Sequence, residues 1–263
     1  MAIVDGQPAG SGSAAESARH YASEIDRACE GKKTDVVLLP ENFNKSNVKN
    51  VQPASMDSEY MRIIREAARR NNTYLAGSLF EDVDGQAFNS AFLIDRRGQV
   101  AGTYHKSHLT TGEMMFSPLS RSEDVRVFKA DFGMVGIAVC FDFHYPEFAR
   151  MLALKGAELV LVPMAADDRL KEEGFARSAE YSGKSFVLEN RIPIAFAATL
   201  AKDIQPSLII DQFCKVLARS NSKQHIIAAE LDLAGVATRW SGDAFHSIHK
   251  VGRRPEMYGD LMK

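Results

Sequence analysis

Apolar residues near the start of the chain recur at the spacing of an amphipathic helix. Between residues 14 and 29 they return every three or four positions, and Gly31 follows where a left-handed cap commonly ends a helix. The apolar positions are Ala14, Ala18, Tyr21, Ala22, Ile25, Ala28 and Cys29. The same spacing predicts a second helix within residues 61–68.

Short apolar runs between and after these helices predict β-strands. The turn formers Asp84-Gly85 and Arg97-Gly98 separate neighbouring runs. The runs cover residues 35–39, 73–80, 88–95, 99–104, 133–140, 158–162, 192–199, 207–210 and 225–231. Further helices are predicted from Pro146 to Gly156 and within residues 173–190.

Helices and strands therefore alternate along the whole chain. Neither a linker nor a low-complexity segment interrupts the alternation. We expect one α/β domain over residues 1–263, in which helices cover sheets that contain more than one strand direction.

Composition excludes several classes of protein. The chain has 263 residues, of which 45% are hydrophobic, enough for a substantial core. Its 32 basic and 34 acidic residues form no block of like charge, which argues against nucleic-acid or polybasic membrane binding. The longest apolar stretch, residues 192–201, is half of the roughly 20 residues that cross a bilayer. No export signal is visible, so we expect a cytoplasmic protein.

The three cysteines form no Cys-x-x-Cys pair, so each thiol needs its own explanation. Cys140 stands where a buried strand breaks toward a helix, and backbone N–H groups of such a turn favour a thiolate and a developing oxyanion. The position also suits a small buried hydrophobic residue, and position alone leaves both interpretations open. Cys29 on an apolar helix face and Cys214 in a predicted hairpin are interpreted as structural.

Two more charged residues end predicted strands. Glu41 follows the run that Pro40 closes, and Lys106 follows the run over residues 99–104. Each alone is typical of a solvated loop. Together with Cys140 they place an acid, an amine and a thiol at one sheet edge, where open α/β sheets bind ligands.

Metal and nucleotide sites have little support in the sequence. The pairs His105/His108 and His246/His249 resemble metal pairs, but neither has an evident third ligand. No glycine-rich phosphate-binding motif is present. We expect no metal and no cofactor.

The strand-end residues lie in blocks that resemble the carbon-nitrogen hydrolase (nitrilase) superfamily, in the family's order and across nearly all of the chain. The blocks are Val-Val-Leu-Leu-Pro-Glu41-Asn-Phe, Tyr-His-Lys106-Ser-His-Leu and Gly-Ile-Ala-Val-Cys140-Phe-Asp-Phe-His-Tyr-Pro-Glu. The resemblance implies a four-layer αββα sandwich. It also implies subunits that pair through helices, so we expect at least a homodimer.

The resemblance assigns roles to particular residues. It implies that Cys140 is the nucleophile, Glu41 the general base and Lys106 the cation that stabilises the oxyanion with the N–H of Phe141. Glu113 matches a second carboxylate that orients the lysine, although a plain loop glutamate remains an alternative. We expect Phe141 and His144 to bind substrate. Asp142 and Glu147 are interpreted as scaffold.

The sequence Cys140-Phe-Asp is similar to the amidase and carbamoylase branches rather than to true nitrilases, which have Cys-Trp-Glu. His144 replaces an arginine of many members, which disfavours a strongly anionic substrate. Around the expected pocket, Leu119, Thr199 and Gln205 depart from the family pattern, so the substrate itself cannot be transferred.

The resulting hypothesis is a thiol amidohydrolase that cleaves a small linear carboxamide to an acid and ammonia through a Cys140 thioester. An N-carbamoyl amidohydrolase is the alternative within this chemistry. An inactive relative that serves as a ligand-binding or interaction subunit is the alternative of another class. We also expect Cys140 to alkylate faster than Cys29 or Cys214, because Lys106 and the turn amides lower its pKa unless an ionised Glu41 opposes them.

Overall fold

The computed structural model describes residues 1–5, 14–43, 53–116, 120–165, 178–199, 206–233 and 252–262. In these residues the strands form two six-stranded sheets. The first sheet has the order β12 (Ile226–Ala228), β1 (Ala2–Val4), β2 (Val36–Leu38), β3 (Tyr74–Val83), β4 (Gln86–Ile94), β5 (Val100–His105). The second has the order β11 (Val216–Arg219), β10 (Leu208–Ile210), β9 (Ile194–Ala197), β8 (Leu159–Pro163), β7 (Gly133–Ile137), β6 (Val127–Ala130).

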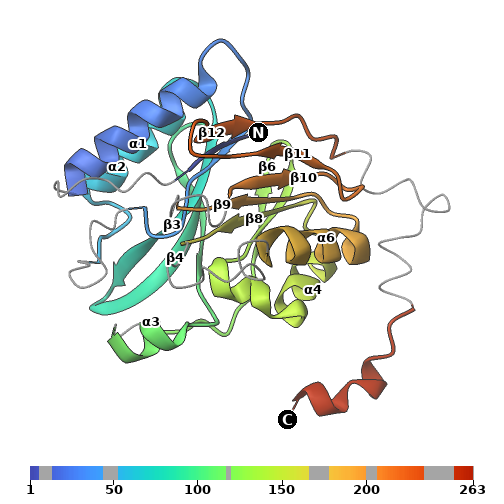
Figure 1. The fold of residues 1–263 in the computed structure, drawn as a ribbon. Coiled ribbons are helices and arrows are strands. Elements are labelled where there is room, and N and C mark those ends of the chain that lie inside the picture. Colours follow the sequence, from blue (N-terminus) through green and yellow to red (C-terminus); the bar gives the residue numbers. More distant parts are fainter. Residues whose placement is uncertain are drawn as a thin grey trace.

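Helices cover the outer faces of both sheets, which gives the predicted four layers (Figure 1). The first sheet is covered by α1 (Ala14–Cys29) and α2 (Glu59–Asn71), and the second by α4 (Pro146–Leu154) and α6 (Ser178–Asn190). Shorter helices are α3 (Thr111–Phe116), η1 (Cys140–His144), η3 (Pro255–Met257) and η4 (Gly259–Met262). Among the described residues no helix is long and apolar enough to cross a membrane.

The strand directions bring distant segments to one edge of the sandwich. β1, β2 and β3 run parallel, and β4 returns antiparallel before β5 takes the direction of β3 again. In the second sheet β7, β8 and β9 are parallel. The chain therefore leaves β2 and β5 at the same edge of the first sheet, as the sequence predicts.

The two sheets meet over an apolar core that needs a glycine at one point. Residues of the inner faces are buried, among them Leu38 and Ala76 of the first sheet and Leu161 and Ala195 of the second. A Cβ atom on Gly102 of β5 would lie 2.2 Å from the Phe128 ring of β6. Gly102 therefore lets the edges of the two sheets close on each other.

The sequence predicts most of these elements but misplaces several ends. Strand β7 ends at Ile137 rather than at Cys140, and the described part of α6 begins at Ser178. Residues 173–177 of the predicted helix lie outside the described residues. Strands β1, β6 and β11 and helix α3 were not predicted, because each is too short for its pattern to show.

Asp5, which follows β1, is a buried carboxyl group between the sheets. It accepts a hydrogen bond from the Ser207 hydroxyl, and burial raises its pKa to about 7 against a smaller opposing effect of Ser220. Since the folded chain holds this proton more tightly than the unfolded chain, the free energy of unfolding should fall as the pH rises from about 4 to 7. Asp5→Asn should remove that fall, worth up to about 4 kcal/mol. Urea unfolding of the wild type and of Asp5→Asn across this pH range measures the difference. Parallel curves of the free energy of unfolding against pH would contradict the prediction.

Candidate active site

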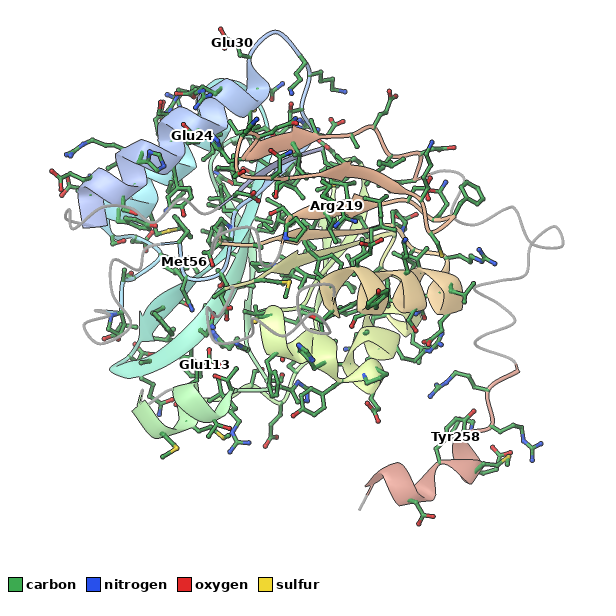
Figure 2. All side chains as sticks on the ribbon, viewed as in Figure 1. Glu24, Glu30, Met56, Glu113, Arg219 and Tyr258 are labelled. Carbon is green, nitrogen blue, oxygen red and sulfur yellow. The ribbon has the colours of Figure 1, made fainter. Side chains whose placement is uncertain are left out.

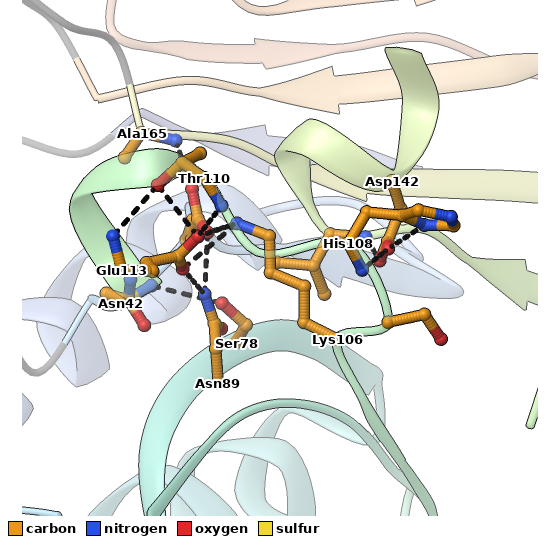
Figure 3. A network of polar contacts seen from close by, with 12 residues as sticks. Asn42, Ser78, Asn89, Lys106, His108, Thr110, Glu113, Asp142 and Ala165 are labelled. Atoms are coloured by element: carbon orange, nitrogen blue, oxygen red, sulfur yellow. Dashed lines mark hydrogen bonds and ion pairs between the residues drawn. The ribbon is translucent and has the colours of Figure 1, made fainter. Parts of the chain in front are cut away.

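An ammonium and two carboxylates meet at the edge where β2 and β5 end. Lys106 follows β5, and its Nζ lies 2.9 Å from Oε1 of Glu41, which follows β2. The same Nζ lies 3.0 Å from each carboxylate oxygen of Glu113 on α3 (Figure 3). Figure 2 shows Glu113 on the side of α3 that faces the sheets. Lys106 and Glu41 are buried, with side chains 1% and 3% exposed.

Ion pairing keeps Lys106 charged despite its burial. Burial alone would lower its pKa, but Glu41, Cys140 and Glu113 raise it well above the ordinary value. Burial likewise opposes ionisation of Glu113, yet Lys106, Thr110 and Asn89 together hold the pKa of Glu113 below its usual range. The pair is therefore an ammonium facing ionised carboxylate at neutral pH.

Backbone and side-chain donors fix the two carboxylates. The Ala165 N–H, just after β8, donates to Oε2 of Glu41 at 2.9 Å. The N–H and the hydroxyl of Thr110 donate to Oε2 of Glu113 at 2.8 and 3.0 Å. Asn89 of β4 donates to both carboxylates. The sequence did not single out Asn89, which lies in mid-strand rather than at a strand end.

Cys140 begins η1 three residues after the end of β7 and adopts φ +47°, a left-handed conformation that is costly for a side chain. Its thiol lies close enough to the Glu41 carboxylate and to the Ala165 N–H for both groups to affect its pKa. The backbone therefore turns sharply at this residue, and the thiol joins the group formed by Glu41 and Lys106.

The expectation that the pKa of Cys140 is lowered is wrong. Burial raises the pKa of the thiol, the charge of Glu41 raises it further, and Lys106 and the Ala165 N–H only partly oppose them. Burial also raises the pKa of Cys29 and of Cys214. Cys140 is thus a neutral thiol beside the Glu41 carboxylate in the resting protein.

Asp142 ties the Cys140 turn to the Lys106 segment. Its Oδ2 accepts from the Val139 N–H at 3.0 Å and from the Tyr104 hydroxyl at 2.9 Å. Its Oδ1 accepts from the His108 N–H at 2.9 Å, and Nδ1 of His108 lies at the same distance. The prediction of Asp142 as scaffold agrees with these contacts, but the partners His108 and Tyr104 were missed.

Asp142→Ala should lower the free energy of unfolding by at least about 3 kcal/mol, because it leaves several buried donors without an acceptor. Denaturant unfolding measures the change. Glu147→Gln, at an exposed position in the first turn of α4, is the control and should change stability by less than about 1 kcal/mol. Equal effects would show that Asp142 does not hold the turn.

Aromatic rings surround the turn on its outer side. The Phe141 ring contacts His144 and Tyr145, with centroid separations of 5.2 and 5.6 Å. The Tyr145 ring stacks on His108 at 3.9 Å. Phe141 is partly buried. The His144 side chain reaches the surface, but desolvation of its ring by neighbouring groups and the charge of Lys106 lower its pKa. Neutral His144 therefore offers hydrogen bonding rather than charge at pH 7.

Other sequence predictions fall at or beyond the limits of the described residues. Thr199 is partly buried at the end of β9, whereas Leu119 and Gln205 lie outside the described residues, as do His246 and His249. In the described ranges, no group of three or more His, Cys, Asp or Glu side chains is arranged to hold a metal ion.

Known proteins resemble this chain in sequence and in fold. A hydrolase from Pseudomonas protegens is 31% identical over 90% of this chain and 84% of its own length. A probable hydrolase of Bacillus subtilis is 28% identical over 67% of this chain, and the match spans 35% of that longer protein. The crystal structure of a carbon-nitrogen hydrolase from Helicobacter pylori covers 100% of this chain and 97% of its own, with a TM-score of 0.82 and 24% identity.

Two further relatives have named activities. The N-carbamoylputrescine amidase of Arabidopsis thaliana is 23% identical over 92% of this chain and 88% of its own length. An omega-amidase of Danio rerio is 23% identical over 82% of this chain and 83% of its own length. The family model for carbon-nitrogen hydrolases matches residues 2–239. The chain is therefore an enzyme of the carbon-nitrogen hydrolase family.

Proposed function

We propose that the protein is a thiol amidohydrolase that converts small linear carboxamides into a carboxylic acid and ammonia. One observation carries the proposal. A thiol on a left-handed turn lies beside a buried carboxylate that acts on its pKa, and that carboxylate is paired with a buried ammonium. This is the set of groups that nucleophilic acyl transfer requires.

In the first half of the reaction, the sulfur of Cys140 attacks the amide carbon while Glu41 accepts the thiol proton. The raised pKa of Cys140 makes this coupled transfer necessary, since little thiolate exists beforehand. The tetrahedral intermediate then collapses, the carbon-nitrogen bond breaks, and protonated Glu41 gives its proton to the departing nitrogen. Ammonia leaves and a thioester remains on Cys140.

The oxyanion needs donors that the resting site already holds. The Phe141 N–H has no hydrogen-bond acceptor among the described residues, so it is available to an oxyanion beside Cys140. Lys106 has three N–H donors, and its three short contacts are all with Glu41 and Glu113. Substrate oxygen must therefore replace one contact, and the doubly bound Glu113 can release one and keep the other.

Water completes the cycle. Glu41 accepts a proton from water, whose oxygen attacks the thioester carbon, and the carbon-sulfur bond breaks. The departing sulfur takes the proton back from Glu41, which restores the thiol and releases the acid. The same two side chains thus serve both halves of the reaction.

An N-carbamoyl amidohydrolase is a second candidate, because a relative that aligns over most of the chain acts on N-carbamoylputrescine. The same attack on a ureido carbon would yield carbon dioxide as well as ammonia. An assay of both gases over amides, N-carbamoyl compounds and nitriles separates the candidates. Ammonia without carbon dioxide supports the amidase, and equal amounts support the carbamoyl hydrolase.

A ligand-binding subunit without activity is the alternative of another class. The presence of a thiol beside a hydrogen-bonded pair of an acid and an amine argues against it. Failure of all three substrate classes to release ammonia would favour the binding role and overturn the amidohydrolase.

We also propose that two copies pair through the outer helices of the second sheet. Large apolar side chains are exposed there, Met151 on α4 and Tyr181 and Leu188 on α6, at 44, 58 and 60%. Light scattering during gel filtration tests the pairing, and a monomer at micromolar concentration would contradict it.

A further inference from the structure

Asn89 is an uncharged residue at the centre of the charged group, which consists of Glu41, Lys106 and Glu113. It lies on β4 and is fully buried. Its side-chain Nδ2 lies 2.7 Å from Oε1 of Glu41 and 2.9 Å from Oε1 of Glu113 (Figure 3). Both amide protons are therefore given to carboxylates that come from two separate segments of the chain.

The same two oxygens also accept from Lys106. Oε1 of Glu41 and Oε1 of Glu113 lie 2.9 and 3.0 Å from Nζ. Two nitrogen donors, one charged and one neutral, thus bridge one pair of carboxylate oxygens. Carboxylates this close repel each other when both are ionised, and each donor offsets part of that repulsion.

Asn89 is also fixed to the Lys106 backbone. The Lys106 N–H donates to the Asn89 carbonyl at 2.8 Å, next to the β4–β5 pairing. Asn89 therefore locates the main chain of the ammonium-bearing residue and the side chains of both carboxylates. A mid-strand residue suits this task, because its backbone is held on both sides.

We propose that Asn89 is a positioning residue that holds the carboxylates of Glu41 and Glu113 side by side against Lys106. The proposal rests on the proposed function, in which Glu41 must be a free base for the thiol proton of Cys140. Without the Asn89 amide, Lys106 is the one donor among the described residues that contacts both carboxylates. Glu113 then rotates away or takes up a proton at a higher pH than in the intact site.

Several ionisable groups face the two carboxylates from neighbouring elements. Lys106 approaches from the end of β5, and Cys140 approaches from η1. The remaining donors, Thr110 and the Ala165 N–H, are neutral. Since Asn89 contributes to the low pKa of Glu113, removing its amide should raise that pKa.

Asn89→Ala is the first variant to test. Oδ1 of Asn89 has no hydrogen-bond partner among the described residues. Truncation to alanine therefore removes the two N–H donors of the amide and leaves no described donor without its acceptor. Asn89→Asp keeps the size and replaces the donating nitrogen by oxygen, which covers the case in which the alanine variant folds poorly. Ser90→Ala is the control, because Ser90 is equally buried but its hydroxyl contacts His105 instead.

Carbon-13 titration of glutamate side-chain carboxyls gives a readout that does not need activity, with Glu113 assigned through Glu113→Gln. Asn89→Ala should raise the Glu113 midpoint by about one pH unit, and Asn89→Asp by at least as much. On an amide that the wild type cleaves, kcat should fall about 10- to 100-fold, and the acidic limb of the pH profile should move upward. Ser90→Ala should leave both unchanged.

Unchanged Glu113 midpoints in both Asn89 variants would overturn the positioning role, whatever the activity. The same changes in Ser90→Ala would overturn it too, because they would report general loosening of β4. The wild type could prove inactive while the Asn89 variants still shift the Glu113 midpoint. That result would contradict the proposed function and would support the positioning of Glu113 by Asn89.

Discussion

Replacing Cys140 by alanine should reduce ammonia release from any amide substrate by at least about a thousandfold. The thiol is the nucleophilic atom at the meeting point of Glu41 and Lys106, and no neighbouring hydroxyl among the described residues contacts Glu41. The measurement is steady-state ammonia release, with circular dichroism to show that the variant folds.

Cys29→Ala and Cys214→Ala are the matched controls. Cys29 ends α1, and Cys214 lies in the β10–β11 turn with its sulfur 3.6 Å from the Lys184 carbonyl oxygen. Neither contacts the charged group in the described contacts, so both variants should retain nearly full turnover. Wild-type turnover in Cys140→Ala would end the thiol mechanism.

Glu41→Gln should change two properties of Cys140 in opposite directions. Turnover should fall by about a hundredfold or more, because the variant has no base for the thiol proton and no acid for the departing nitrogen. Alkylation of Cys140 at pH 8 should become about tenfold faster, because the neighbouring Glu41 carboxylate raises the pKa of the thiol. Lys106 then acts on the thiol without opposition from Glu41.

Iodoacetamide labelling followed by peptide mapping measures the alkylation rate at each cysteine. Glu113→Gln provides the comparison, since Glu113 contacts Lys106 but is not among the main influences on the Cys140 pKa. It should slow turnover without speeding alkylation. Slower alkylation in Glu41→Gln would show that Glu41 activates the resting thiol rather than suppressing its ionisation.

The layered fold was predictable because its long elements carry clear periodicity. The apolar spacing in residues 14–29 matches α1, and Gly31 has the positive φ that its place after the helix suggests. Strand ends were less predictable. Ala138 and Val139 are apolar and fully buried, so pattern alone extends β7 to Cys140, although the chain has already turned.

The meeting of Glu41, Lys106 and Cys140 was predictable from strand direction and from the family blocks. The electrostatic state of the thiol was not, because it depends on the balance of burial, Glu41 and Lys106 in three dimensions. Asn89 was missed for a related reason. A polar residue inside a strand normally points to solvent, and only the β3–β4–β5 register shows that this one faces the carboxylates.

Intact-mass measurement of the protein during turnover tests the central claim most directly. Acid quenching of wild type mixed with an amide substrate should reveal an adduct equal to the substrate less ammonia, mapped to Cys140 and absent from Cys140→Ala. A stronger adduct in Glu41→Gln would fit a base that hydrolysis requires. Ammonia release without any adduct at Cys140, or with an adduct at another residue, would contradict the account.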